Sequence, residues 1–304
     1  MSGHSHEHGA PNDDAHDDDA QQSHAHAHSH AHSHDSDFDW ARWAEQLELE
    51  AATLMPLIDD VVAIHTPGVD WATAQHVLDL GCGPGVISCA LAHHAPHAHV
   101  TALDSSVQLL TRVRHHAVEQ QVATRVHTLE ADMEAVLPAL RPMDVVWAGM
   151  VLHHVADRPA VLGNLRGILQ PGGTLVMIEF AGPPEALPAD DPAQGAWDRL
   201  EAGVVASRNE RIGLDPNTID WPQLLADAGF ELITDNVLSA DHCPPLDDVA
   251  RQWLQRHVER SIEWLDGTLS DDDVVALSAL AARDDLSLRH ERRVLTARRP
   301  LAAS

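Results

Sequence analysis

The chain has 304 residues, 44% of them hydrophobic, so it can build one large domain or two smaller ones around a sizeable core. Its formal net charge is −28, with 47 acidic residues against 19 basic ones, and every basic residue is Arg. Such a surface repels phosphate backbones and anionic lipids, which disfavours partners that are nucleic acids or membrane surfaces.

The cysteines and the apolar runs indicate the compartment. Cys82, Cys89 and Cys243 form neither a CxxC pair nor a disulfide framework, which suits a reducing environment. The N-terminus lacks the pattern of a secretory signal peptide, and no apolar run approaches the length of a membrane span. We therefore expect a soluble cytoplasmic protein, with a homodimer among the oligomeric states that the sequence allows.

Residues 1–39 are a low-complexity segment rich in His and Asp, and they are predicted to be disordered because they carry too little apolar surface to bury. Six imidazoles alternate with small residues, at His24, His26, His28, His30, His32 and His34. Neutral imidazole is a good ligand for divalent transition metals, so a metal-binding tail is one interpretation. A solvating tail with incidental metal affinity is the other, and it is the favoured interpretation.

Residues 40–72 are predicted to form a helical cover, with a helix over 40–65 that Pro56 divides in two. From residue 76 onward short β-rich runs alternate with amphipathic stretches, which predicts an α/β fold with a mostly parallel sheet. The expected strands are 76–80, 99–103, 125–129, 144–148 and 174–179. The expected helices are 86–94, 106–120, 133–140 and 158–169.

The second half of the chain interrupts this alternation. Residues 73–180 form the predicted core, and 181–218 are an insertion that opens with Pro and Gly, contains a helix over 194–208, and suits a lid. Residues 219–304 complete the domain. They comprise a helix over 219–229, a strand over 230–238, a helical insertion over 246–282 and a last strand over 292–298.

A glycine-rich turn follows the first expected strand, with glycine at 81, 83 and 85 and an acid, Asp79, two residues before the first of them. The dinucleotide pattern GxGxxG needs a glycine where Val86 stands, which disfavours a nicotinamide-dependent oxidoreductase. An acid beside the turn suits a cationic ligand better than a phosphate.

Two further acids follow the next two strands. Asp104 ends the second strand, where a carboxylate can accept hydrogen bonds from both hydroxyls of a ribose. Asp132 follows the third strand, where it can accept from an adenine amine while the backbone of Met133 donates to a ring nitrogen. Each of the two acids could instead cap a helix.

With the segment from Met143 to Val155 and the turn Leu169-Gln-Pro-Gly-Gly-Thr-Leu175, these pieces resemble the class I S-adenosylmethionine-dependent methyltransferases. The resemblance is to the small-molecule, ubiquinone- and menaquinone-biosynthesis-like branch. It covers residues 75–180 strongly, and it implies a Rossmann-like seven-stranded sheet with helices on both faces and an antiparallel last strand.

The resemblance also implies roles for residues. Asp79, Gly81, Cys82, Gly83 and Gly85 would surround the methionine part of the cofactor, and Asp104 with Ser105 would hold the ribose. Asp132 and Met133 would hold the adenine, and Ala148, Gly149 and Met150 would lie beside the sulfonium. Cys82 is interpreted as a packing residue rather than a nucleophile.

The implied reaction moves a methyl group to an O, N or C atom of a small molecule. His153, His154 and Glu179 are the candidate proton acceptors, and a structural role for the histidine pair is the favoured interpretation. The alternative is a non-catalytic S-adenosylmethionine-binding or metal-handling protein that uses the His-rich tail.

Overall fold

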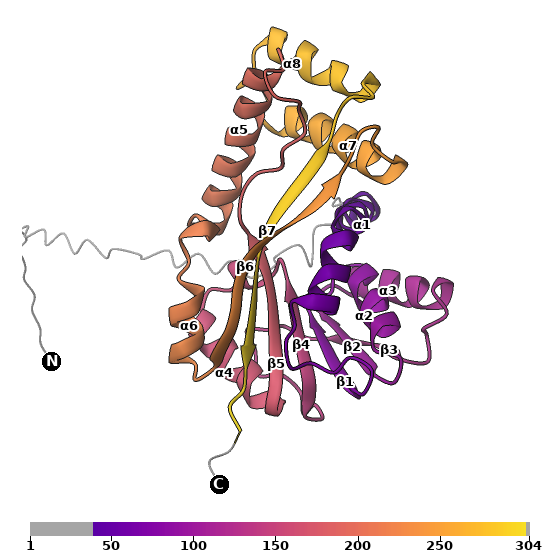
Figure 1. Cartoon of the computed structure of the whole chain (residues 1–304), viewed down its shortest axis with the longest axis vertical. Helices are drawn as coiled ribbons and strands as arrows, with labels where there is room; N and C mark the ends of the chain where they lie inside the picture. The colour runs from indigo at the N-terminus through magenta and orange to yellow at the C-terminus, as the bar shows by residue number, and fades with distance from the viewer. Residues whose placement is uncertain (1–38, 302–304) are drawn as a thin grey trace, which may run out of the picture.

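The computed structural model describes residues 39–301 and contains a seven-stranded sheet in the order β3-β2-β1-β4-β5-β7-β6 (Figure 1). β7 pairs antiparallel with both of its neighbours, and the remaining pairs are parallel, which confirms the predicted fold class. The strands are β1 (His76–Leu80), β2 (His99–Asp104), β3 (Val126–Glu130), β4 (Met143–Gly149), β5 (Leu169–Phe180), β6 (Glu231–His242) and β7 (Leu288–Arg298).

The helices begin where short polar side chains can cap them. Asp39, Ser106, Asp157, Asp220, Asp247 and Ser270 each accept a hydrogen bond from a backbone N–H in the first turn of the helix that follows. The helices are α1 (Trp40–Ile64), α2 (Val86–His94), α3 (Val107–Glu119), α4 (Arg158–Ile168), α5 (Gln194–Ile212), α6 (Trp221–Asp227), α7 (Asp248–Trp264) and α8 (Asp271–Ser278), with short 3₁₀ turns at Leu152–His154, Pro216–Thr218 and Ala279–Ala282.

Two local predictions are wrong. Residues 133–140 form no helix, because Pro138 and Pro142 leave too short a stretch for helical hydrogen bonding, and Val136 is exposed. Pro56 does not divide the first helix, since α1 continues through it. The apolar residues on both sides of Pro56 are buried in one cluster, and this packing outweighs the missing hydrogen bond.

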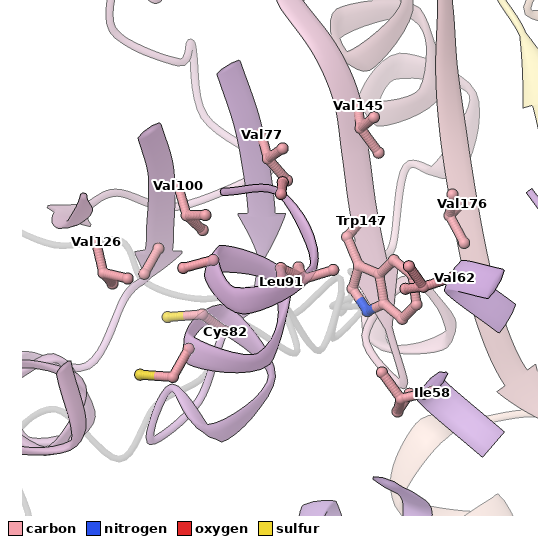
Figure 2. Close-up of a cluster of buried hydrophobic side chains, with 14 of the residues drawn as sticks. Ile58, Val62, Val77, Cys82, Leu91, Val100, Val126, Val145, Trp147 and Val176 are labelled. Carbon is pink, nitrogen blue, oxygen red and sulfur yellow. The ribbon is translucent and has the colours of Figure 1, made fainter. Parts of the chain in front are cut away.

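Helices cover both faces of the sheet. α1, α2 and α3 bury one face, and Trp147 of β4 lies beside Ile58 and Val62 of α1 in that cluster (Figure 2). The other face is covered by α4 and α6, whose apolar residues pack with those of β1, β4 and β5. The central strands are therefore apolar on both sides, and their polar groups are confined to their ends.

β6 and β7 extend beyond the sheet into a second group of helices, α5, α7 and α8, which we call the upper lobe (Figure 1). The pairing of β5 with β7 ends at Phe180 opposite Arg292, whereas β6 and β7 stay paired as far as His242 opposite Leu288. The upper lobe has its own apolar cluster, which includes Trp197, Trp253 and Leu277. In residues 39–301 no helix has the length and apolarity needed to span a bilayer.

Replacing Pro56 by Ala should stabilise the protein by about 1–3 kcal/mol, because it restores an N–H donor for the carbonyl of Ala52 and removes a ring clash. The midpoint of urea denaturation measures this, with Asp60→Ala on an exposed position of the same helix as the control. A lower midpoint would mean that the bend at Pro56 is needed for α1 to pack.

Candidate cofactor site and catalytic residues

The glycine-rich turn leaves β1 at the carboxyl edge of the sheet and leads into α2. Gly81, Gly83 and Gly85 have φ values of 64°, 54° and 87°, in the left-handed region that favours glycine. The backbone N–H of Cys82 donates to the carbonyl of Leu103 on β2 at 2.9 Å, which ties the turn to the neighbouring strand. The turn therefore sits between the ends of β1 and β2.

The three positions of the turn are glycine for different physical reasons. A Cβ on Gly81 would lie 2.4 Å from Cγ2 of Val151, and one on Gly85 would lie 2.9 Å from the Cα of Val113, so both serve close packing. A Cβ on Gly83 would meet only Cδ1 of Leu47, at 3.8 Å. Gly83 is thus the position where the backbone of the turn has room for a ligand.

Asp104 joins the turn to the start of α3. Its carboxylate accepts hydrogen bonds from the N–H of Gly83 at 3.0 Å and from the N–H of Ser106 at 2.9 Å. Ser106, not Asp104, is the N-cap of α3, so the interpretation of Asp104 as a helix cap is wrong. The side chain is half-buried, and an ionised carboxylate has about four acceptor positions, so it can accept further donors such as ribose hydroxyls.

Asp79 is buried at the end of β1, 2% exposed, and accepts a hydrogen bond from Ser88 Oγ at 2.5 Å. Burial raises the pKa of Asp79 to about 7; the hydrogen bond from Ser88 opposes that shift, and the nearby charge of Asp104 adds to it. A cation placed beside this group would favour its ionised form. Asp79 is therefore poised to change protonation when a cationic group binds.

The remaining predicted cofactor residues lie at the same edge of the sheet. Asp132 is exposed and accepts from the N–H of Glu134 at 2.9 Å, in a segment without a helix, so the helix-cap interpretation fails here too. Met133 is buried, and its Cε lies 3.4 Å from the position of a Cβ on Gly81. Met150 follows β4 with a φ of 56°, an unfavourable value for a residue with a side chain and typical of functional sites.

The other members of the predicted set differ in accessibility. Ala148 is buried, whereas Gly149 and Met150 are half-buried and Ser105 is exposed.

Burial raises the pKa of the Cys82 thiol well above its usual range, and the charges of Asp79 and Asp104 act in the same direction. A thiol that stays protonated is a poor nucleophile, which agrees with the interpretation of Cys82 as a packing residue.

His153 and Glu179 form a buried pair, with His153 Nδ1 2.6 Å from Glu179 Oε2, and the N–H of Leu152 donating to Glu179 Oε1 at 3.1 Å. Burial is the main cause that lowers the pKa of His153 to about 3 and raises the pKa of Glu179 to about 8. Both groups are thus held in their neutral forms near pH 7. His154 is exposed, and its ring lies 4.0 Å from that of His153.

α1 crosses this edge of the sheet and is fastened to α3. Glu48 of α1 accepts hydrogen bonds from Arg112 Nε and Nη2, both at 2.7 Å, and lies 3.0 Å from His116 Nε2. Burial acts to raise the pKa of Glu48, but hydrogen bonds from Arg112 and His116 outweigh it and lower the pKa. Leu47 of α1 faces Gly83, so the contacts of Glu48 with α3 hold α1 over the open side of the glycine turn.

Glu48→Gln should loosen α1 and speed the release of S-adenosylhomocysteine by about three- to tenfold, since one bidentate ion pair is lost. Stopped-flow displacement measures the rate. Glu45→Gln is the matched control, because Glu45 lies on the same helix and pairs with Arg256 through exposed side chains. Equal release rates in the wild type and Glu48→Gln would show that α1 does not gate the site.

The predicted metal ligands of the tail, from His24 to His34, lie outside the described residues. Within residues 39–301 no cluster of three or more His, Cys, Asp or Glu side chains is placed to hold a metal ion.

The polar groups at the glycine turn suit an organic ligand rather than a metal ion. A buried acid, a partly exposed acid and an open glycine backbone fit an ammonium group, ribose hydroxyls and a closely approaching organic ligand, which are the parts of S-adenosylmethionine.

Comparisons with known proteins agree with this geometry. The profile of a family described as a methyltransferase domain matches residues 77–173. The trans-aconitate 2-methyltransferase of Azoarcus sp. is 33% identical over 136 residues, which are 44% of this chain and 50% of that protein. A ubiquinone biosynthesis O-methyltransferase of Coxiella burnetii is 35% identical over 101 residues, 33% of this chain and 42% of that protein. The chain thus spans about half the length of the curated relatives it matches.

Solved structures support the fold alone. A candidate methyltransferase from Bacillus halodurans has a TM-score of 0.51 at 18% identity, covering 81% of this chain and 98% of that one. An O-methyltransferase family protein from Burkholderia thailandensis has a TM-score of 0.51 at 15% identity, covering 86% and 61%. The matched sequence profile thus identifies a methyltransferase domain over residues 77–173, and the seven-stranded sheet and the solved structures agree on its fold.

Proposed function

We propose that the protein transfers the methyl group of S-adenosylmethionine to an oxygen, nitrogen or carbon atom of a small molecule. One observation carries this proposal: the ends of β1 and β2 bring the open glycine Gly83 and the carboxylate of Asp104 within 3.0 Å of each other. That pairing offers a backbone surface and a hydroxyl acceptor in one place, as a nucleoside-containing ligand requires.

The chain's own residues would then bind and align the reactants. Asp79 would face the ammonium group, Asp104 and Ser105 the ribose, and Asp132 with Met133 the adenine, while Gly81 to Gly85 and Ala148 to Met150 surround the methionine part. When bound, the cofactor supplies a methyl group that is already activated on a sulfonium. The protein therefore contributes alignment and the exclusion of water, with α1 and the 181–218 insertion as the cover.

On the substrate side, we assign different roles to the three predicted proton acceptors. His153 and Glu179 are buried as a neutral pair, so they position the segment after β4 rather than accept a substrate proton near pH 7. His154 is exposed beside them and is the residue that can reach a hydroxyl or amine of a substrate.

Isothermal titration of the full chain with S-adenosylmethionine and S-adenosylhomocysteine tests the cofactor assignment directly. Binding of both in a single site is the expected result, and the absence of binding by either would overturn the proposal. Transfer of an isotopically labelled methyl group to small molecules from a cell extract, detected by mass spectrometry, then tests the reaction.

His154→Ala should slow turnover without changing the affinity for S-adenosylhomocysteine if His154 accepts the substrate proton.

We propose metal binding by the tail as a separate property. Alternating neutral imidazoles at His24 to His34 would take a divalent transition metal such as zinc. Titration of zinc into the full chain and into a full-length variant with these six residues replaced by Ala tests this. Equal zinc binding by the two proteins would contradict it.

A further inference from the structure

Buried polar groups without partners gather where the upper lobe meets the sheet. In the part of the chain that the structure describes, seven buried side-chain atoms lack a hydrogen-bond partner, and all seven are nitrogens. Five of them belong to α1, α7 and β7: Gln46 Nε2, Trp253 Nε1, Arg260 Nε, His290 Nε2 and Arg292 Nε. Buried donors left unpaired cost free energy, so buried N–H groups without a protein partner require acceptors from water or from a ligand.

Arg208 of α5 and Arg292 of β7 lie against the ring of Phe180 at the end of β5. The guanidinium carbon of Arg208 is 4.1 Å from the centroid of Phe180, and that of Arg292 is 5.8 Å from it. Arg292 is 4% exposed, donates to the carbonyl of Glu291, and has Glu50 of α1 at 3.6 Å as its ion-pair partner. A guanidinium this deeply buried is well suited to recognise an acidic ligand.

This pair of arginines adjoins the predicted reaction centre. Phe180 lies two residues beyond Ile178, whose carbonyl accepts from the N–H of Met150 at 2.8 Å. The ring of Phe180 is 4.8 Å from that of His153. A molecule held by Arg208 and Arg292 would therefore sit beside the segment that is predicted to face the sulfonium.

Positive charge is in excess here, although the whole chain carries −28. Arg260 and Arg211 lie near the pair, and in each of the four arginines burial is the first cause that lowers the pKa; in Arg211, Arg260 and Arg292 the charge of a neighbouring arginine lowers it further. The ionised acids that act on them are Glu50, Asp215, 3.9 Å from Arg208, and Glu201, 2.6 Å from His257. Glu179 also acts on Arg292, but its burial keeps it neutral near pH 7, and Arg42, which acts on Arg260, is paired with Glu263. Four cations therefore face three ionised acids, an excess of one positive charge.

Two residues of this set border a groove at the surface. A groove of about 460 Å³ between α1 and α7 is lined by Gln46 and Arg260, which are two of the five residues with orphan donors. The upper lobe and β7 supply most of these donors, and Figure 1 shows β7 rising from the sheet into that lobe.

We propose that the methyl acceptor is a small molecule with a single carboxylate, which Arg292 and Arg208 bind between β7, α5 and the ring of Phe180. This inference rests on the proposed methyltransferase function and specifies its substrate class. A carboxylate oxygen can accept from the unpaired Nε of Arg292, and the single negative charge of the group matches the local excess. The ring of Phe180 gives an apolar surface to the rest of the molecule.

The test measures the affinity of the full chain, saturated with S-adenosylhomocysteine, for acids and their neutral counterparts. The probes are trans-cinnamate with trans-cinnamamide and hexanoate with hexanamide, followed by ligand-observed NMR. Each acid should bind at least about tenfold more tightly than its amide. Arg292→Met and Arg208→Met should each abolish that preference, whereas Arg289→Met, an exposed change on the same strand as Arg292, should keep it.

Two readouts separate this inference from the proposed function. If the wild type fails to bind S-adenosylhomocysteine, the methyltransferase proposal fails. If it binds S-adenosylhomocysteine but binds amides as well as acids, or if inorganic phosphate binds more tightly than either acid, the carboxylate site is refuted. Unchanged S-adenosylhomocysteine affinity in the variants shows that they are folded, and Arg208→Met, on the half-buried side chain, covers the case in which Arg292→Met does not fold.

Discussion

Asp104→Ala should weaken S-adenosylhomocysteine binding at least a hundredfold. Two hydrogen bonds from ribose hydroxyls to a carboxylate contribute about 1.5–3 kcal/mol each, so losing both removes about 3 kcal/mol or more. The same change also removes the acceptor of the Gly83 and Ser106 N–H groups, which loosens the turn itself. Isothermal titration at constant pH measures the dissociation constant.

Glu130→Gln is the matched control for Asp104→Ala. Glu130 is directly opposite Asp104 in the pairing of β2 with β3, and it is exposed. Removing its charge should change the affinity by less than about twofold, since exposed charges contribute little. An affinity for Asp104→Ala within threefold of the wild type would contradict the ribose assignment, while the fold would stand.

The affinity for S-adenosylhomocysteine should fall about twenty- to thirtyfold between about pH 7.5 and pH 5.5. Asp79 has a pKa of about 7 in the free protein, raised first by burial, and a bound ammonium group would lower it. Below pH 7 the acid must lose its proton before the ligand binds, which costs a factor of about ten per pH unit. Above pH 7 Asp79 is already ionised, so the affinity levels off.

Asp79→Asn separates this effect from a general effect of acid. The amide keeps the shape of the side chain and the contact with Ser88 but has no titration, so the affinity of this variant should be low and nearly independent of pH. Calorimetry in two buffers of different ionisation enthalpy should show one proton released on binding to the wild type near pH 6. The same pH dependence in the wild type and Asp79→Asn would place the ammonium group elsewhere.

Regular periodicity made the core of the fold predictable. β1 and α2 have the predicted bounds, and α3 and α4 differ from their predicted ranges by one residue at one or both ends. The prediction missed residues 239–242 of β6 and 288–291 of β7, because charged and polar residues such as Asp241, His242 and Glu291 hide the alternation of a strand.

The predicted cofactor residues could be placed from the sequence because they follow strand ends at fixed spacing. The structure places Asp79, Gly83, Asp104 and Asp132 at one edge of the sheet, as that spacing requires. The arginine cluster was missed. Arg208, Arg260 and Arg292 lie on α5, α7 and β7, far apart in the chain, and only the packing of the upper lobe on β7 brings them together.

The continuity of β7 has a consequence for engineering. Its lower half pairs with β5 inside the sheet, and its upper half supports a lobe built from residues 181–220 and 243–287, both outside the matched range 77–173. The first segment lies between β5 and α6 and the second between β6 and β7, so the two can be exchanged together while the strands that carry the glycine-rich turn stay unaltered. Grafting the corresponding segments from a methyltransferase with another acceptor should therefore reshape the acceptor site around Arg292 and Phe180 and leave S-adenosylhomocysteine affinity intact.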